Sequence, residues 1–299
     1  MFDLDLGIDL GATTSRVYEP RRGVVLEKRA DSVTGCARPG LNTHAVEHSV
    51  RHLLEVVHRS PLRRPRVVMT VPCHTAVEER RAVEAATLRA GARTAVTIEA
   101  PVAAGIGAGV EVGATTPSMV VDIGGCWTEV AVVAFGTMQH SLSIPVGGAA
   151  IDGAIVMRTH ASHGLVITAA TAEQIKITLG SAVPLVSEGL AEVTGTDRAG
   201  ATAAVILSSK EVRRWIREPV EAMLSAVGRV LDELPARTAA DLLDGELVLT
   251  GGGALLPGLD HRMAAVSGMN VRVAQQSHLA AVVGAGSCVD HVARAAQRS

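Results

Sequence analysis

The sequence predicts an α/β protein made of two similar halves, and three observations support this. Short apolar segments rich in Val and Ile alternate with longer segments of helical periodicity along most of the 299 residues, a pattern typical of α/β folds. An Asp–Gly turn between two apolar segments occurs at Asp9 and again at Asp122. A buried strand over Glu246 to Thr250 leads into three consecutive glycines, a second kind of turn that lets backbone approach a ligand.

Composition limits the classes of function. Hydrophobic residues make up 47% and charged residues 19%, which fits a globular protein of about two domains. No apolar run reaches the roughly 18 residues that span a bilayer, and the strand-like, acidic N-terminus does not resemble a signal peptide. We therefore expect a cytoplasmic protein. The net charge of −2 and the 2% aromatic content argue against nucleic-acid binding.

Cysteine and histidine spacing gives no metal motif. The four cysteines are scattered without a C-x-x-C pair, which predicts reduced thiols rather than a disulfide framework or a zinc site. His160 and His163 lack a third ligand nearby in the sequence.

The two Asp–Gly turns form an internal repeat. Residues 9–17 match residues 122–130 at a constant offset of 113, sharing Asp, an aliphatic residue, Gly, a small residue, a hydroxyl residue and Val. Glycines at a turn let backbone N–H groups approach phosphate oxygens, and an Asp can hold Mg²⁺ or its waters. Two such turns facing each other would clamp a phosphate chain. Ordinary hairpins and chance duplication remain alternative interpretations.

The first half continues with alternating helices and strands. Thr43 is expected to cap a helix reaching about Arg59 with one apolar face. Expected next are a strand at 67–71 ended by Pro72, a helix at 78–90 stopped by Gly91, a strand at 96–98 and a thin, small-residue helix opened by Pro101. The loop 59–66 gathers Arg59, Arg63, Arg64 and Arg66 around Leu62. It reads either as a solvated basic loop or as a contact with an anionic membrane surface.

The second half shows two capping-box patterns. Thr171 to Gln174 predicts the start of a helix that carries Lys176 and ends at Gly180, and Ser208 to Glu211 predicts the start of a long helix to Leu234. Pro219 predicts a kink in that helix. Strands are expected within 183–207, at 246–250 and at 271–274, followed by a final helix over about 279–296.

Several of these stretches together resemble the MreB/Mbl family of bacterial actin homologues. GIDLGATTSRVY is similar to the family's first phosphate loop and SMVVDIGGCWTEVAVV to its second. PRVVMTVPCHTAVEERRAV, AEQIKITLGSA and LVLTGGGALLPGL also look like family segments. The resemblance implies an actin-like α/β fold with duplicated RNase H-like lobes around a nucleotide cleft. On this basis the first lobe would span 1–113 plus 278–299, and the second 114–277.

The resemblance also implies ATP and Mg²⁺ in the cleft. Asp9 and Asp122 would hold the metal through water. The other residues expected to bind the nucleotide are Gly11, Ala12, Thr13, Thr14, Gly124, Gly125, Cys126, Trp127, Glu173, Gln174, Ile175, Lys176, Gly252, Gly253, Ala254 and Leu255.

The chain departs from the family pattern in places that bear on catalysis. Cys126 and Trp127 stand where a Gly and a Thr are expected, and Ala12 replaces an expected Thr. Ala100 replaces the Glu that resembles the water-positioning residue, whose loss typically costs about 10²–10⁴ in rate. The neighbouring Glu99 is expected to face elsewhere. No catalytic residue is therefore assigned. The short segment between the strands at 24–26 and 67–71 predicts that most of the small roof subdomain of the first lobe is missing.

The expected function is an actin-like cytoskeletal protein that binds ATP weakly or hydrolyses it poorly and takes part in cell shape and cell-wall organisation. Its expected partners are copies of itself or a full-length MreB-type relative in filaments, and membrane-associated cell-wall synthesis proteins at the inner face of the cell membrane. Contact with the membrane through Leu62, Arg63, Arg64 and Arg66 is a further expectation. The alternative is a pseudo-actin interaction module without nucleotide turnover. A sugar kinase or chaperone ATPase is disfavoured, because neither an acceptor-site Asp nor a peptide-binding region is evident.

Overall fold

Two five-stranded sheets of the same topology form the centre of the molecule. The computed structural model describes residues 4–29, 42–57 and 64–289. The first sheet has the order β3-β2-β1-β4-β5, with β1 (Asp5–Leu10), β2 (Thr14–Glu19), β3 (Gly23–Arg29), β4 (Arg66–Val71) and β5 (Thr94–Glu99). The second has the order β12-β11-β6-β7-β8, with β6 (Ser118–Ile123), β7 (Thr128–Ala134), β8 (Thr137–Ile144), β11 (Glu246–Thr250) and β12 (Asn270–Val273).

Strand directions show that the duplication extends to whole sheets. In the first sheet, β1, β2 and β3 pair antiparallel in succession, and β4 and β5 are added parallel to β1. In the second sheet, β6, β7 and β8 repeat the antiparallel run, and β11 and β12 are added parallel to β6. The internal repeat seen in the sequence therefore marks the first hairpin of two equivalent sheets.

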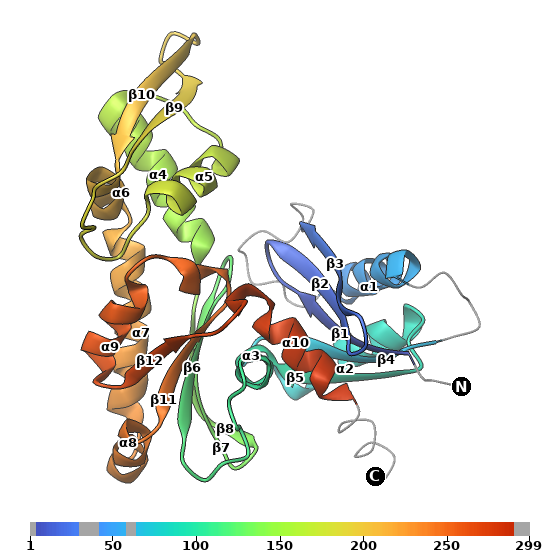
Figure 1. The fold of residues 1–299 in the computed structure, drawn as a ribbon. Helices are drawn as coiled ribbons and strands as arrows, with labels where there is room; N and C mark the ends of the chain where they lie inside the picture. The colour runs from blue at the N-terminus through green and yellow to red at the C-terminus, as the bar shows by residue number, and fades with distance from the viewer. Residues whose placement is uncertain (1–3, 30–41, 58–63, 290–299) are drawn as a thin grey trace.

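Helices cover the sheets in each half (Figure 1). In the first half, α1 (Thr43–Val57) and α2 (Val77–Arg89) pack beside a core that includes Leu6, Ile8 and Leu53. In the second half, the larger core gathers residues of the sheet and of the surrounding helices. These helices are α4 (Gly148–His163), α5 (Ala169–Leu179), α6 (Ser209–Trp215), α7 (Arg217–Glu233), α8 (Ala236–Leu243) and α9 (Leu259–Ser267).

The second half carries an antiparallel hairpin of β9 (Leu190–Thr196) and β10 (Thr202–Ser208). Figure 1 shows the hairpin projecting beyond α4 and α5, at the far end of that half. In the first half, the described residues between β3 and β4 contain α1 and no such hairpin. This agrees with the expectation that most of a roof subdomain is missing there.

Two helices of small residues meet at the junction of the halves. These are α3 (Ala100–Gly107) and α10 (Ala280–Ser287). A Cβ added at Gly107 would lie 1.9 Å from the carbonyl oxygen of Ala280, and one added at Gly284 would lie 1.8 Å from that of Ala103. Only glycine permits so close an approach of two backbones. The thin, small-residue helix predicted after Pro101 is confirmed as α3, and its small residues allow this close packing.

The structure confirms most of the predicted strands and helices but shifts two caps. Of the final helix expected over about 279–296, α10 covers Ala280–Ser287, and residues 290–299 lie outside the described residues. Helix α1 is capped by Asn42 rather than Thr43, because the Asn42 Oδ1 accepts the N–H groups of His44 and Ala45. Helix α5 starts earlier than the Thr171 pattern predicted, because Thr168 is the cap and its Oγ1 accepts the N–H of Thr171 at 3.1 Å.

The capping box at Ser208 and Glu211 is confirmed. The long helix that it was expected to begin is interrupted at Ile216, between α6 and α7. Pro219 lies in the first turn of α7, where a missing N–H leaves no helical hydrogen bond unmade. The predicted kink is thus a break three residues before the proline.

Candidate functional site

A cleft with a cavity of about 620 Å³ lies between the two sheets. It is lined by fifteen of the predicted site residues: Asp9, Gly11, Ala12, Thr13, Thr14, Asp122, Gly124, Gly125, Cys126, Trp127, Glu173, Lys176, Gly252, Gly253 and Leu255. Residues far apart in the sequence therefore meet at one place, as the repeat predicted.

Three predicted site residues do not line the cleft. Ile175 and Ala254 are buried in the core of the second half, and Gln174 is exposed elsewhere on α5. On a helix, residues three and four apart share a face. Glu173 and Lys176 therefore point into the cleft together with Ile177, which sequence reasoning missed. Gln174, Ile175 and Ala254 are therefore not among the residues that line the cleft, and their role in nucleotide binding stays a prediction.

Each aspartate at the cleft floor receives a hydrogen bond from a threonine on the adjacent parallel strand. Thr70 Oγ1 of β4 donates to Asp9 Oδ1 at 2.6 Å. Thr250 Oγ1 of β11 donates to Asp122 Oδ1 at 2.9 Å. The two pairs occupy equivalent places in the two sheets, so the duplication includes the group that orients each carboxylate.

A third carboxylate lies beside these aspartates. Glu129 on β7 pairs in register with Asp122 and accepts the backbone N–H of Cys73 at 2.8 Å. Burial raises the pKa of Asp9 and of Glu129. Burial, together with the charge of Glu129, raises the pKa of Asp122 to about 7. A floor of buried acids attracts a cation, whose charge would offset their mutual repulsion.

The two turns touch each other. A Cβ at Gly125 would lie 2.3 Å from Cγ2 of Thr13, so glycine is required for the second turn to approach the first. The start of α4 holds the second turn from behind, since the N–H groups of Gly148 and Ala149 donate to the carbonyls of Gly124 (3.0 Å) and Gly125 (2.7 Å). The turns therefore face each other across the cleft.

One cysteine of the cleft forms a disulfide, whereas the sequence predicted reduced thiols. Cys126 is buried and disulfide-bonded, whereas Cys73 and Cys288 are free. Burial raises the pKa of the Cys73 thiol, and the charge of Glu129 adds to that effect. The Cys73 thiol is therefore a poor nucleophile.

Charged residues of α5 have partners that sequence reasoning missed. Lys176 Nζ donates to Asp152 Oδ2 at 3.0 Å, and burial raises the pKa of Asp152. Glu173 forms an ion pair with Arg29 at the end of β3. This pair joins the two halves across the cleft opening.

The two residues where β5 ends and α3 begins lie as predicted. Ala100 lines the cleft. Glu99 instead forms an ion pair with Arg80 at 2.8 Å, so its carboxylate does not replace the missing one.

The glycines after β11 shape the opposite wall. Gly251 has φ of +78°, and a Cβ there would lie 2.3 Å from the carbonyl oxygen of Ile123. The following Gly252–Leu255 segment is a short 3-10 helix, η2. This segment brings a glycine-rich turn to the cleft, as the three glycines predicted, and Leu255 at its end also lines the cleft.

The donor set of the cleft fits a hydrated metal ion. Among the described residues, no three His, Cys, Asp or Glu side chains cluster with metal-site geometry. Two aspartates that hold an ion through its waters need no such cluster, and Mg²⁺ keeps several waters when it binds beside phosphates. Mg²⁺ with a phosphate chain is therefore compatible with Asp9 and Asp122.

The basic loop has partners within the chain. Arg64 donates to the carbonyls of Leu88, Gly91 and Ala92 at the end of α2. Arg66 pairs with Asp5 through two hydrogen bonds of 2.6 Å. These two residues of the expected membrane contact thus stabilise the fold, and Leu62 and Arg63 lie outside the described residues. None of the described helices is long and apolar enough to cross a membrane.

Comparisons with known proteins match the whole chain. The family model described as MreB/Mbl protein matches residues 33–297. The cell shape-determining protein MreB of Escherichia coli (strain K12) is 34% identical, and the match covers 98% of this chain and 95% of that protein. The cell shape-determining protein Mbl of Bacillus subtilis (strain 168) is 29% identical, with coverage of 100% and 99%.

Solved structures show the same fold. The crystal structure of MreB5 of Spiroplasma citri bound to ADP gives a TM-score of 0.89 at 20% identity, covering 99% of each chain. The MamK double helical filament gives a TM-score of 0.77 at 15% identity, with coverage of 97% and 99%. The fold is therefore actin-like, with two α/β lobes. By the family match and by its identity to curated relatives, this chain belongs to the MreB/Mbl family.

Proposed function

We propose that this chain is an actin-like cytoskeletal protein that binds Mg-ATP in the cleft, hydrolyses it poorly, and takes part in cell shape and cell-wall organisation. The observation that carries the proposal is the pair of facing turns, each with an aspartate oriented by a threonine. Structural neighbours bound to ADP and to AMPPNP support nucleotide as the ligand, and the names of the curated relatives support the role in shape.

The residues of the cleft have separable roles in this proposal. Asp9 and Asp122 hold Mg²⁺ through water, and the metal offsets the charge of the phosphates. Backbone N–H groups of both turns bind phosphate oxygens. Lys176 and Glu173 contact the nucleoside, which η2 supports from the opposite wall. The two lobes correspond to 1–113 with 278–299, and to 114–277.

Poor hydrolysis follows from Ala100. The methyl side chain lines the cleft where the family resemblance expects a carboxylate, and a methyl group can neither orient a water nor accept its proton. Glu99 is held by Arg80. Nucleotide would therefore remain bound as the triphosphate for longer than in a relative with the carboxylate.

A calorimetric titration with Mg-ATP tests the proposal. We expect binding to the unmodified chain, at least tenfold weaker binding to Asp122→Asn, and phosphate release near background. Absence of heat, together with no rise in melting temperature, would remove the nucleotide part. Asp260→Asn, an exposed aspartate on α9, serves as the matched control.

The second candidate is a pseudo-actin that retains the fold without using nucleotide. Trp127 favours this candidate. It lines the cleft and has a bulky side chain where the family resemblance expects a phosphate-contacting Thr. Trp127→Thr separates the two candidates. Tighter Mg-ATP binding in the variant, with none in the parent, favours the pseudo-actin.

Filament formation is proposed on the basis of the relatives, which include a structure of the MamK double helical filament. The partners would be copies of this chain or a full-length MreB-type relative, with membrane-associated cell-wall synthesis proteins at the inner face of the cell membrane. Sedimentation with Mg-ATP over a range of protein concentrations tests self-assembly. Protein that stays in the supernatant well above micromolar concentration alone, but sediments with the relative, would restrict the proposal to mixed filaments.

A further inference from the structure

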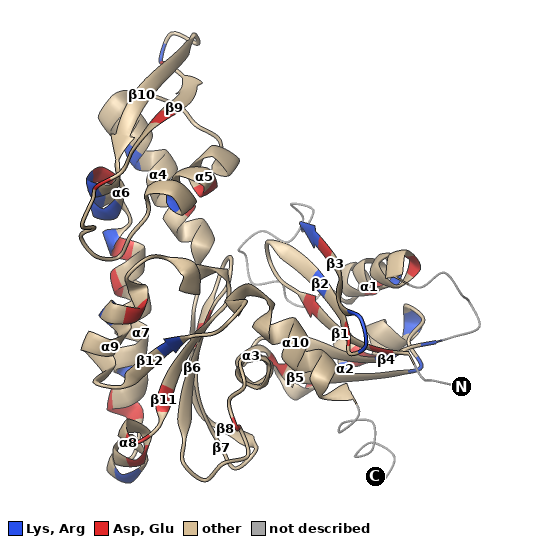
Figure 2. Ribbon diagram, viewed as in Figure 1, with Lys and Arg blue, Asp and Glu red and all other residues tan. Residues whose placement is uncertain are grey.

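A second hollow, of about 390 Å³, lies in the second lobe at the break between α6 and α7. Its charged walls come from three helices: Lys210, Arg213 and Arg214 of α6, Arg217 and Glu221 of α7, and Arg262 of α9. Ile216 and Val220 lie beneath these side chains and are buried. Figure 2 shows the basic residues of α6 on the side of the second lobe away from the first lobe.

The basic residues form one continuous stripe. Lys210, Arg213 and Arg214 of α6 follow the spacing i, i+3 and i+4, which places their side chains on one helical face, and Arg217 of α7 lines the same hollow. At 1.5 Å per residue the stripe is roughly 10 Å long. The interruption at Ile216 lets α6 and α7 both contribute to it.

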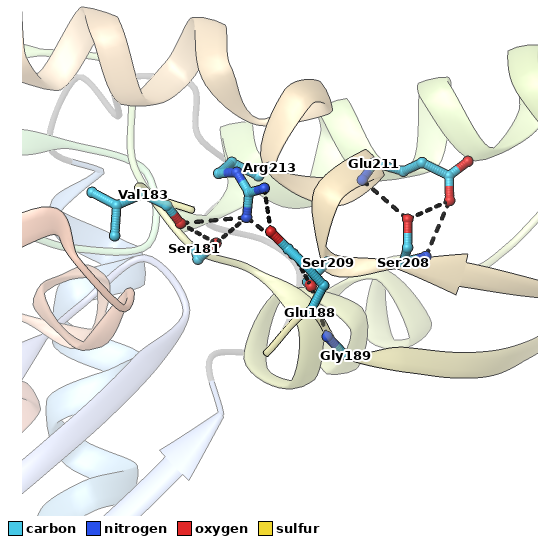
Figure 3. A network of polar contacts seen from close by, with 8 residues as sticks. All are labelled: Ser181, Val183, Glu188, Gly189, Ser208, Ser209, Glu211 and Arg213. Carbon is cyan, nitrogen blue, oxygen red and sulfur yellow. Dashed lines mark hydrogen bonds and ion pairs between the residues drawn. The ribbon is translucent and has the colours of Figure 1, made fainter. Parts of the chain in front are cut away.

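Two of the cations are fully engaged in the fold. Arg213 pairs with Glu188 at 2.6 Å and also donates to Ser181 Oγ and the Val183 carbonyl (Figure 3). The hydrogen bond from Arg213 is the main cause that lowers the pKa of Glu188 to about 2. Arg262 donates to Glu221 at 2.9 Å. Both nearby carboxylates are therefore already in use.

The remaining cations carry excess charge. Lys210 and Arg214 are exposed and have no hydrogen-bonding or ion-pair partner among the described residues. Arg217 is 78% exposed and reaches Glu221 only at 3.9 Å. Glu211 forms no ion pair with these cations, and its carboxylate instead accepts from Ser208 (Figure 3) and pairs with His163. Lys210 and Arg214 thus add two positive charges with no partner among the described residues, and Arg217 adds a third that Glu221 offsets only across 3.9 Å.

We propose that this hollow binds an acidic segment of a partner protein, one with several Asp or Glu side chains and an aliphatic residue between them. Cations spread along roughly 10 Å suit successive carboxylates on an extended chain better than a single phosphate, which would contact one or two of them. The aliphatic stems of the lysine and arginine side chains offer apolar contact to the aliphatic residue of the partner. Complementary charge also speeds association and selects against basic partners. The site lies outside the nucleotide cleft and does not depend on the proposed function.

The test is fluorescence anisotropy with the full-length chain and a labelled ten-residue peptide of Asp and Glu with two central Leu residues. The hollow variant is K210E/R214E/R217E. The matched control, R81E/R158E/R237E, makes the same change in net charge at arginines exposed elsewhere. We expect the hollow variant to bind at least tenfold more weakly and the control less than twofold. A peptide with Lys in place of the acids should not bind.

A milder variant shows whether weaker binding comes from lost charge or from misfolding of the triple variant. K210Q/R214Q removes the two unpaired charges without reversing them, and we expect it to weaken binding about threefold to tenfold with an unchanged melting temperature. Equal losses in the hollow and control variants would overturn the proposal, because net charge alone would then explain binding. So would a peptide that fails to bind the parent chain, whether or not phosphatidylglycerol vesicles or pyrophosphate bind the hollow.

Discussion

Cys73, in the first lobe, donates its backbone N–H to the carboxylate of Glu129, in the second, across 2.8 Å. Glu129 lines the cleft but is only 6% exposed, so this bond joins the lobes at the cleft floor with little contact with water. A buried hydrogen bond to a charged acceptor is stronger than one between neutral groups. The same carboxylate repels Asp122, so one residue both holds the lobes together and adds charge repulsion at the cleft floor.

Replacing Glu129 separates these two effects. Glu129→Ala leaves the Cys73 N–H unpaired, and we expect the free energy of unfolding to fall by about 1–3 kcal/mol in urea titrations. Glu129→Gln keeps an acceptor and removes the charge, so its loss should be smaller and the pKa of Asp122 should fall. If the two variants lose stability equally, the hydrogen bond is not what Glu129 contributes.

The raised pKa of Asp122 predicts a pH dependence of stability. The folded chain binds this proton with a pKa of about 7, compared with an ordinary value of 3.8. Because the folded state holds the proton more tightly than the unfolded state, this group lowers the free energy of unfolding as pH rises from about 4 to 7. Above pH 7 its effect is constant.

Unfolding at a series of pH values, without nucleotide or Mg²⁺, measures this dependence. Asp122→Asn removes the titration while its side-chain oxygen still accepts from Thr250, so the variant should gain most relative to the parent near pH 7 and least near pH 4. A stability difference that does not vary over this range would contradict the prediction.

Ala100→Glu should restore hydrolysis if the geometry of the cleft is otherwise sufficient. A carboxylate at this lining position can orient a water and accept its proton, and we expect phosphate release to rise by about 10²-fold or more. Ala100→Gln is the control, because it has similar size and no basic group. Equal rates in the two variants would show that other departures, such as Trp127, limit turnover.

The contact between α3 and α10 predicts a strong effect of a single methyl group. Gly107→Ala places a Cβ 1.9 Å from a backbone oxygen, so we expect a loss of about 3 kcal/mol or more, at or above the upper end for overpacking. Gly153→Ala is the matched control. Gly153 is in α4 with no atom within 4 Å of the added Cβ, and alanine there should stabilise by about 0.5–1 kcal/mol. Urea unfolding of both variants checks the contrast.

Much of the fold could be predicted because its signals are local. Alternating apolar residues mark β1, β2, β6 and β7, and the matched Asp–Gly turns reveal the duplication before any contact is known. Helix starts were less certain, since Thr168 and Thr171 are three residues apart and either could have been the cap. The local sequence pattern does not show which hydroxyl accepts the free N–H group, because this depends on the direction in which the chain enters the helix.

The connections within the cleft could not be predicted from local pattern. Thr250 and Asp122 are 128 residues apart and Cys73 and Glu129 are 56 apart, so these bonds become visible only once strands and lobes are placed. The family resemblance identified the segment Glu173 to Lys176 but did not show which of its side chains point into the cleft. Helical periodicity explains afterwards why Gln174 and Ile175 turn away while Ile177 joins the cleft.

The glycine contact between α3 and α10 has a mechanical meaning. The chain passes from the first lobe to the second just after α3, and returns just before α10. Both crossings therefore lie next to a contact where backbone touches backbone. A rotation about this contact would change the angle between the lobes with little rearrangement of side-chain packing. The β9–β10 hairpin lies far from this contact (Figure 1). A rotation of a few degrees between the lobes would therefore displace the tip of the hairpin more than it displaces residues beside the contact. The position of the hairpin would then depend on whether the cleft is open or closed.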